Sequence, residues 1–287
     1  MAAVLKNETA FWPVDKLILA YFAFAMVAIG VAWNHLAEAP WLVATHIVGA
    51  AALIYEVRRP NPTSWIFRHW YPLLYVAWCY KEMALLIPAL RRTDADQWLA
   101  NLDYRLWGVN PTVWLERIMT PARTEYLQVV YTLFVPMVLL PAFILWRKQR
   151  FPEFQYFAFL IALGYLVSYV GYLIVPARGP RFLLMHLQHV PLRGLWLFQS
   201  MQTTLDRLES AHYDCFPSGH TELTILAWWS TRQFGKRSLF WLSFAYTLSI
   251  IFATVYLRYH YTVDVLAGVL VAIILIWATP FIYRKLT

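Results

Sequence analysis

Long apolar stretches recur along the chain and are separated by short segments that hold most of the charged residues. A helix that crosses a bilayer needs about 20 predominantly apolar residues. The pattern therefore predicts an all-α, polytopic membrane helix bundle with about eight transmembrane helices, of which the second and sixth are short. The predicted spans are Lys16–Trp33, Trp41–Val57, Trp70–Leu90, Tyr126–Trp146, Phe154–Val175, His220–Phe234, Ser238–Leu257 and Tyr261–Tyr283.

One segment between the predicted spans has a different pattern. Residues Asp94–Pro121 are amphipathic and are interrupted by Gly108, Asn110 and Pro111. A helix of this kind lies in the plane of the interface rather than crossing the membrane. We therefore predict that this segment rests on the membrane surface. No internal repeat, low-complexity tract or second soluble domain interrupts the pattern.

The basic residues of the short loops predict the orientation of the bundle. With eight spans, four basic groups fall on the same side as the N-terminus, which the positive-inside rule makes cytoplasmic. The long loops 91–125 and 176–217 then face the opposite side, together with the starts of the sixth and eighth spans. The four groups are Arg58, Arg59 and Arg68; Arg147, Lys148 and Arg150; Arg232, Lys236 and Arg237; and Arg284 with Lys285.

Composition agrees with a membrane protein. Hydrophobic residues make up 60% of the 287 and charged residues only 14%, whereas a soluble domain carries about 25% charged residues. The net charge of +8 is explained by the basic loops, so we expect no nucleic-acid partner. Cys79 and Cys215 lie at different predicted depths, which predicts no disulfide, and no Cys/His zinc spacing occurs. The segment Met1–Lys16 lacks a cleavage pattern, so the first span is expected to be retained.

Two polar motifs stand at the starts of the sixth and eighth spans. The first, Asp214–Thr221, reads as a turn that opens a helix, where backbone N–H groups and the Ser218 hydroxyl face an anion and His220 occupies the first turn. About 40 residues later, the sequence RYHYTVD places His260 and Asp264 four residues apart. This spacing predicts one helix face, on which the carboxylate holds the imidazole in one tautomer. Two histidines, a carboxylate and a phosphate-sized cradle predict phosphoryl transfer.

Three blocks in order, GYLIVPARGPR at Gly171–Arg181, then FPSGH and HYTVD, resemble the type 2 phosphatidic acid phosphatase superfamily of membrane phosphatases and phosphotransferases. The resemblance covers the last four predicted spans, with the third and fourth as scaffold, and so implies a six-helix catalytic core. We interpret the chain as one integral membrane domain. Residues 1–123 supply the N-terminal spans and the interfacial segment, and residues 124–287 the catalytic core.

The resemblance implies a role for each motif residue. His260 would attack phosphorus and form a phosphohistidine, and Asp264 would orient it. His220 would protonate the departing oxygen and then deprotonate the acceptor. The phosphoryl oxygens would be bound by Ser218, Gly219, Arg178 and Arg181. This chemistry requires no metal and no cofactor, and the sequence offers no obvious set of metal ligands.

The chain departs from the phosphatase pattern at two cations. The family's first block carries a lysine seven residues before an Arg-Pro pair, but Ile174 stands there relative to Arg181, and the order is Pro-Arg. The third block carries an arginine six residues before the nucleophile, where this chain has Thr254. Arg258 is the candidate substitute for that phosphate-binding arginine. A site with fewer cations suits a diester, which carries one negative charge, better than a monoester, which carries up to two.

The sequences HYTVDV and SGHT also look like the sphingomyelin synthase and inositol phosphorylceramide synthase branch, whose members move a phosphorylated head group from a glycerophospholipid to a lipid alcohol. We therefore favour head-group transfer between membrane lipids at the non-cytoplasmic face. Hydrolysis of a lipid phosphate of the phosphatidate or polyprenyl phosphate type is the alternative. A non-catalytic lipid-binding or transport protein is the alternative from another class. Short loops favour a bacterial inner membrane. The head group, the acceptor, the oligomeric state and the roles of Lys81, Glu82, Glu222 and Arg258 stay open.

Overall fold

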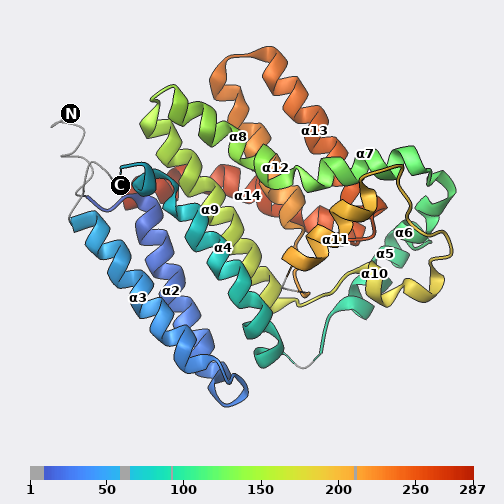
Figure 1. The fold of residues 1–287 in the computed structure, drawn as a ribbon, viewed down its shortest axis with the longest axis horizontal. Coiled ribbons are helices and arrows are strands. Elements are labelled where there is room, and N and C mark those ends of the chain that lie inside the picture. The colour runs from blue at the N-terminus through green and yellow to red at the C-terminus, as the bar shows by residue number, and fades with distance from the viewer. Residues whose placement is uncertain (1–9, 59–64, 92, 210–211) are drawn as a thin grey trace.

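The computed structural model describes residues 10–58, 65–91, 93–209 and 212–287. Long helices form a bundle, and short helices gather beside one end of it (Figure 1). The described residues form no β-strand, only one isolated bridge between Ala177 and Asp214. The predicted all-α bundle is confirmed. Its elements are α2 (Pro13–Ala32), η1 (Trp33–His35), α3 (Ala39–Arg58), α4 (Trp65–Leu90), α5 (Asp96–Trp107), α6 (Pro111–Trp114), η3 (Leu115–Ile118), α7 (Pro121–Thr132), α8 (Phe134–Arg147), α9 (Phe151–Ile174), α10 (Pro180–Leu183), η4 (Met185–Leu187), α11 (Phe198–Leu208), α12 (Gly219–Thr231), η5 (Arg232–Phe234), α13 (Arg237–Tyr256) and α14 (Thr262–Leu286).

Six helices in the described part of the chain are long and apolar enough to cross a membrane: α2, α3, α4, α9, α13 and α14. The fourth predicted span is a broken one, because α7 and α8 meet at an angle of 45°. Pro136 explains the break. Its ring clashes with the carbonyl of the residue four positions earlier, Thr132, where α7 ends.

The sixth predicted span is the short helix α12. Its 13 residues extend only about 20 Å, against a hydrocarbon core of about 30 Å, and it packs among α8, α9, α13 and α14. Lys16 Nζ donates a hydrogen bond to the carbonyl of Leu286, so α2 begins beside the end of α14 (Figure 1). Ends on one side require an even number of crossings. The six single helices and the bent pair make seven crossings in the described part of the chain, so we count α12 as the further crossing that brings the total to eight.

The predicted basic side of the bundle is partly visible in the contacts. Arg150 Nη1 donates to the carbonyl of Gln233 at 3.3 Å, so two of the basic loops meet. Arg68 is a correction: it does not lie in a loop but in the first turn of α4, fully buried, where it forms an ion pair with Asp15 at 2.5 Å. The predicted span began too late to include it. Arg59 lies outside the described residues.

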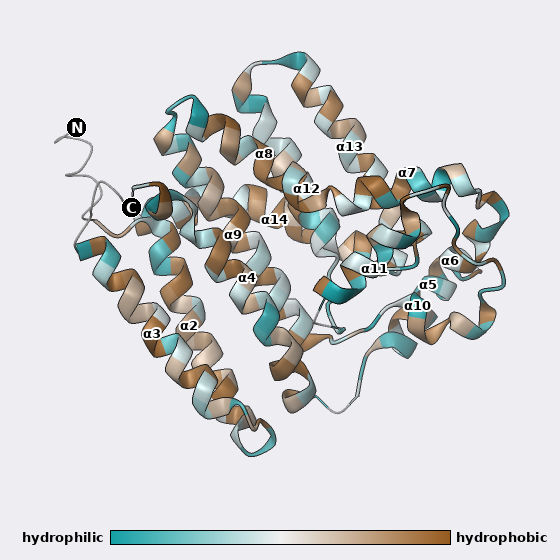
Figure 2. Ribbon diagram, in the orientation of Figure 1, coloured by the Kyte–Doolittle hydropathy of each residue, from teal (hydrophilic) through white to brown (hydrophobic). Residues whose placement is uncertain are grey.

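The two long segments between spans form the short helices at one end of the bundle. Figure 2 shows apolar residues along the long helices and mixed polarity in α5, α6, α10 and α11. Helix α5 occupies the first part of the predicted interfacial segment and ends at Gly108, whose φ of 70° is left-handed. It packs against α14 and α10. The short helices thus surround the end of the bundle at which α14 begins.

Three ionisable residues for which the sequence predicted no role form polar contacts between helices. Glu82 pairs with His46 of α3 at 3.3 Å, inside the N-terminal part of the bundle. Lys81, its neighbour, donates to a backbone carbonyl of α11. Glu222 is fully buried and accepts a hydrogen bond of 2.6 Å from Ser168 of α9. Each of these side chains ties one helix to another.

Candidate active site

The two motifs meet where α12 and α14 begin. Ser218 is the N-cap of α12, and its hydroxyl accepts a hydrogen bond from the Thr221 N–H at 3.4 Å. Its own N–H donates to the carbonyl of Asp264 at 3.0 Å. Gly268 permits this approach, because a Cβ there would lie 2.6 Å from the Ser218 carbonyl oxygen. Ser218 is therefore buried as a helix cap, and Gly219 is the member of the pair that faces the cavity.

His260 precedes its helix rather than sitting on it. Because α14 begins at Thr262, the prediction that His260 and Asp264 share a helix face is wrong. The imidazole Nδ1 instead lies 2.8 Å from the backbone carbonyl oxygen of Cys215 and 3.6 Å from Asp264 Oδ2. A carbonyl can only accept a hydrogen bond, so Nδ1 carries the proton and Nε2 keeps its lone pair. The Cys215 carbonyl thus fixes the tautomer.

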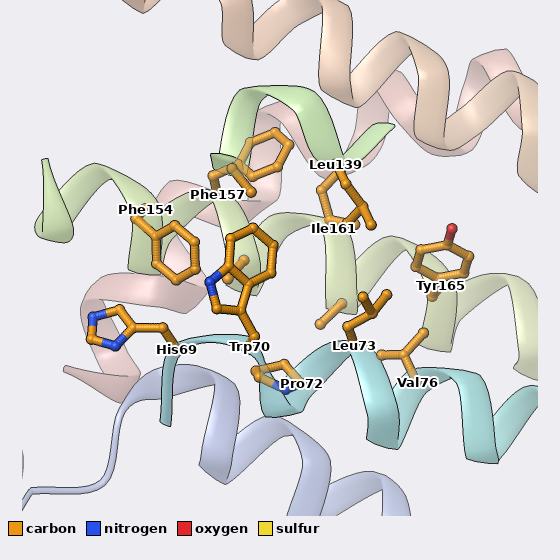
Figure 3. A pocket seen from close by; sticks show the side chains of 13 residues that line it. His69, Trp70, Pro72, Leu73, Val76, Leu139, Phe154, Phe157, Ile161 and Tyr165 are labelled. Carbon is orange, nitrogen blue, oxygen red and sulfur yellow. The ribbon is translucent and has the colours of Figure 1, made fainter. Parts of the chain in front are cut away.

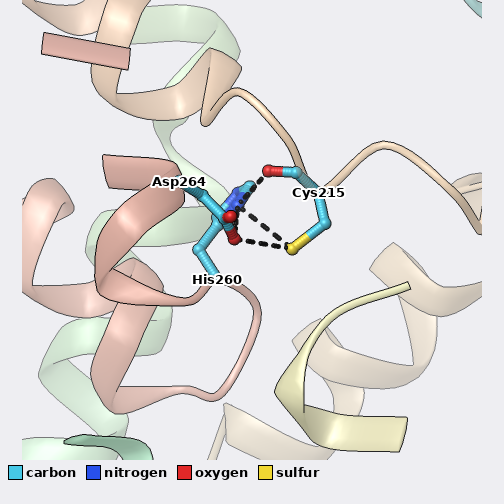
Figure 4. Close-up of side chains that lie close together, drawn as sticks. All are labelled: Cys215, His260 and Asp264. Carbon is cyan, nitrogen blue, oxygen red and sulfur yellow. Dashed lines mark hydrogen bonds and ion pairs between the residues drawn. The ribbon is translucent and has the colours of Figure 1, made fainter. Parts of the chain in front are cut away.

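Asp264 caps the helix and lies beside the histidine. Its Oδ2 accepts a hydrogen bond from the Tyr261 N–H at 2.7 Å. The same oxygen accepts one from the Cys215 thiol at 2.9 Å (Figure 4). Burial raises the pKa of the Cys215 thiol, which keeps the thiol protonated and able to donate. The buried carboxylate is therefore held in place close enough to stabilise positive charge on His260.

The same three side chains form a set that can hold a metal ion. A thiol, an imidazole nitrogen and a carboxylate oxygen from Cys215, His260 and Asp264 lie within 4.8 Å of one another. A metal would require the thiolate and would displace the Nδ1 proton that bonds the Cys215 carbonyl. With the Cys215 thiol and His260 Nδ1 protonated, hydrogen bonds alone explain why the three side chains lie together. The absence of metal from the chemistry stays a prediction.

His220 lies on the first turn of α12, as predicted, and faces His260 with 5.8 Å between the ring centroids. Two aromatic rings from the bent span hold it: Tyr131 stacks on the imidazole at 4.4 Å and Phe134 lies at 4.3 Å. Both histidines line a cavity of about 250 Å³. The arrangement presents two imidazoles to the same space, one of them with the lone pair of Nε2 fixed by the hydrogen bond at Nδ1.

Two of the three predicted arginines reach this cavity. Arg178 and Arg181 line it. Among the described residues Arg178 has no ion-pair partner, whereas Arg181 pairs with Glu209 at 2.9 Å. The structure does not bring Arg258 to the site. Its backbone takes a left-handed φ of 68°, and its guanidinium pairs with Glu116 at 2.7 Å.

A family model described as the PAP2 superfamily matches residues 97–278, which is more than half of the chain. The chain belongs to the PAP2 superfamily. Comparisons with curated proteins and with solved structures find no match. The matched region contains both histidines, Asp264 and both cavity arginines, but not α2, α3 or α4. The protein is thus a multi-pass membrane member of a family of lipid phosphoesterases.

This PAP2 cavity also contains acidic side chains that the sequence did not identify as part of the site. Glu209 and Asp214 line it, and Tyr80 of α4 donates a hydrogen bond to Asp214 at 2.7 Å. Burial raises the pKa of both carboxyl groups. Tyr80 lies ahead of the matched region, so an N-terminal helix contributes directly to the wall of the PAP2 site.

Asp96 of α5 holds the loop that carries the arginines. Its carboxylate accepts hydrogen bonds from the N–H groups of Arg178 at 2.7 Å and Gly179 at 2.8 Å, and from the Tyr261 hydroxyl at 2.9 Å. Gly179 adopts a φ of 96°, and a Cβ there would lie 2.5 Å from the Tyr259 carbonyl oxygen. One carboxylate therefore ties the first block of the PAP2 motif to the third.

Asp103, seven residues further along α5, holds the start of α14. Its carboxylate accepts hydrogen bonds from the Thr262 N–H and hydroxyl at 2.9 and 2.7 Å and from the Val263 N–H at 2.9 Å. Residues seven apart share one helix face. The spacing of Asp96 and Asp103 in an amphipathic segment was the only sign in the sequence that this helix takes part in the site. Their hydrogen-bond partners lie too far away in the sequence to be predicted.

Proposed function

We propose that this protein transfers a phosphorylated head group from a membrane phospholipid to an alcohol, with His260 as the nucleophile. The observation that carries the proposal is the orientation of His260. Its Nδ1 is engaged by the Cys215 carbonyl at 2.8 Å, which leaves Nε2 with the lone pair, and His220 lies 5.8 Å away between ring centroids. Binding alone does not require a nucleophile held in one tautomer beside a proton carrier.

In the first half of the proposed reaction, His260 Nε2 attacks phosphorus and a nitrogen–phosphorus bond forms. The bond from phosphorus to the departing alcohol oxygen breaks, and that oxygen takes its electron pair and a proton from protonated His220. His260 then carries a positive charge in a phosphohistidine. Asp264, 3.6 Å from Nδ1, balances this charge.

In the second half, His220 is neutral and takes the proton of the acceptor hydroxyl. The acceptor oxygen attacks phosphorus, the nitrogen–phosphorus bond breaks, and its electron pair returns to His260. A lipid or polyol alcohol yields a new phosphoester, whereas water yields the free phosphorylated head group. In both halves the Arg178 guanidinium and the Gly219 N–H are positioned to bind the phosphoryl oxygens.

The charge of the cavity favours a diester substrate. Arg178 has no acidic partner among the described residues, but Arg181 is already paired with Glu209, and Arg258 points elsewhere. Asp214 adds a further carboxyl group to the wall. A phosphodiester carries one negative charge and a monoester up to two, so few unpaired cations and nearby acids suit the diester. This supports transfer of a head group more than hydrolysis of a lipid phosphate.

We place the site at the non-cytoplasmic face. The basic loops at Arg150 and Gln233 meet at the far end of α12, and the histidines lie at its start. The positive-inside rule assigns the basic end to the cytoplasm. A donor phospholipid would then be drawn from the outer or lumenal leaflet.

Activity of the purified protein in mixed lipid micelles tests the proposal. We would supply phosphatidic acid and a panel of phospholipid diesters with a diacylglycerol acceptor whose acyl chains differ in length from those of the donors. Free phosphate, free phosphorylated head group and new lipid species would be followed together. New phospholipid without phosphate release, lost in His260→Ala, is the expected result. Phosphate release that depends on His260 would make the protein a phosphatase. Equal signals from both proteins would favour the lipid-binding or transport interpretation.

A further inference from the structure

The wall of the catalytic cavity includes a helix that lies outside the matched PAP2 region. Leu73, Val76, Ala77 and Tyr80 of α4 line the cavity that contains both histidines. The family match begins only at residue 97. Therefore α4 faces the catalytic space although it belongs to the N-terminal part of the chain.

A second, smaller cavity of about 50 Å³ continues from the first. It shares Leu73, Val76 and Tyr165 with the catalytic cavity. Figure 3 shows it lined mostly by apolar side chains, with Trp70 of α4 and Phe154 of α9 at the end away from Tyr165 and His69 beside them. Shared lining residues make the two cavities one route that leads away from the histidines.

The packing of the helices explains why a route exists here. Helices α4 and α8 both pack on α9, and they meet each other where the rings of Trp65 and Trp70 lie 5.8 and 6.2 Å from the ring of Trp146, so a groove with α9 as its floor remains between them. Leu73 of α4, Leu139 of α8 and Ala158 of α9 line it and are only half-buried. The groove is therefore open along its side, toward the apolar solvent of a membrane.

We propose that this groove binds one hydrocarbon chain of the lipid substrate, with the chain running from the histidines toward Trp70 and Phe154. The inference rests on the proposed lipid phosphoester chemistry at His260. Trp70 and Tyr80 are ten residues apart on α4, about 15 Å along the helix axis. That length is about half of the thickness of the hydrocarbon core. An aliphatic chain is the occupant that matches a lining without charged side chains and an opening toward lipid.

Neighbouring residues on α4 provide a matched pair of variants. Leu73 lines both cavities, whereas Leu74 is 60% exposed on another face of the helix. Leu73→Trp fills the groove and is expected to lower kcat/KM at least about tenfold for a dioleoyl phospholipid, the loss expected when two methylene groups are displaced. A dihexanoyl phospholipid, too short to reach the distal groove, loses less. Leu74→Trp leaves both activities within about twofold, a surface-level effect.

A second variant and a binding measurement separate the possible failures. Ala158→Leu narrows only the distal cavity and is expected to reduce turnover of the dioleoyl substrate but not of the dihexanoyl one. A phospholipid with a diazirine at the end of its acyl chain is expected to label peptides containing Trp70 or Phe154, also in the inactive His260→Ala protein. Labelling of other peptides, or an unchanged preference for chain length in both Leu73→Trp and Ala158→Leu, would overturn the proposal that the groove binds an acyl chain. Absence of turnover in the wild-type protein with correct labelling would overturn only the proposed chemistry.

Discussion

Asp103→Asn tests whether α5 positions the nucleophile from outside the catalytic motifs. The Asp103 carboxylate accepts three hydrogen bonds at the start of α14, two of them on one oxygen. An asparagine can keep those two but turns its NH₂ group toward the Thr262 N–H. The variant thus loses one hydrogen bond to a charged acceptor, which contributes about 1.5–3 kcal/mol. His260 lies two residues before Thr262, so the lost restraint acts directly on the position of the proposed nucleophile.

We expect Asp103→Asn to unfold about 4 °C lower in detergent, at about 2 °C per kcal/mol for a chain of this size. Displacement of a reacting group by about 1 Å costs up to about 100-fold in rate, so kcat is expected to fall by about 10- to 100-fold with little change in KM. Asp94→Asn is the control, because Asp94 is exposed and does not contact α14. Equal kcat values for Asp103→Asn, Asp94→Asn and the wild type would refute the positioning role.

Three further predictions concern charge, the thiol and metal ions. Burial raises the pKa of Glu209, so the cavity gains negative charge as pH rises through that pKa, and KM for an anionic donor is expected to rise. Glu209→Gln should weaken this pH dependence, to which Asp214 also contributes. Because the variant leaves Arg181 paired only with the half-exposed Asp206, it should improve phosphatidate binding up to about tenfold, about 1.4 kcal/mol, whereas an unchanged KM profile would contradict the assignment. Cys215→Ala removes a hydrogen-bond donor to Asp264 and is expected to lower kcat about tenfold, the contribution of one such hydrogen bond. Cys215→Ser and the distant Cys79→Ala are expected to keep activity. Equal rates for all three variants would contradict the role of the thiol. Dialysis against a chelator is expected to leave activity unchanged, and activity that is lost and then restored by Zn²⁺ would convert the three-residue cluster into a metal site.

The architecture was predictable because span length and the placement of basic residues are imposed by the bilayer. The bend of the fourth span has a local cause as well, in Pro136. The burial of Arg68 has no local cause in the sequence, because its partner Asp15 lies on another helix and only the packing of α2 against α4 brings the two together. Sequence patterns thus locate the spans but not the polar contacts between them.

The candidate site divides in the same way. Both histidines were identifiable because a polar motif at the start of an apolar helix has a strong local signature, and the structure brings the two together. The sequence predicted that Asp264 fixes the tautomer of His260, whereas in the structure the Cys215 carbonyl fixes it. Arg258 looked available by spacing, but its left-handed backbone directs it to Glu116. Contacts made by backbone atoms and by residues far apart in the chain leave no periodic pattern to read.

The measurement that tests the central claim most directly is detection of the covalent intermediate by intact-protein mass spectrometry. A nitrophenyl diester of the phosphorylated head group needs no acid to leave, so His220→Ala protein should complete the first half-reaction and stall before the second. We predict a mass increase equal to one phosphorylated head group, mapped to His260 and absent from the His220→Ala/His260→Ala double variant. Full turnover by His260→Ala without any adduct would contradict a phosphohistidine mechanism.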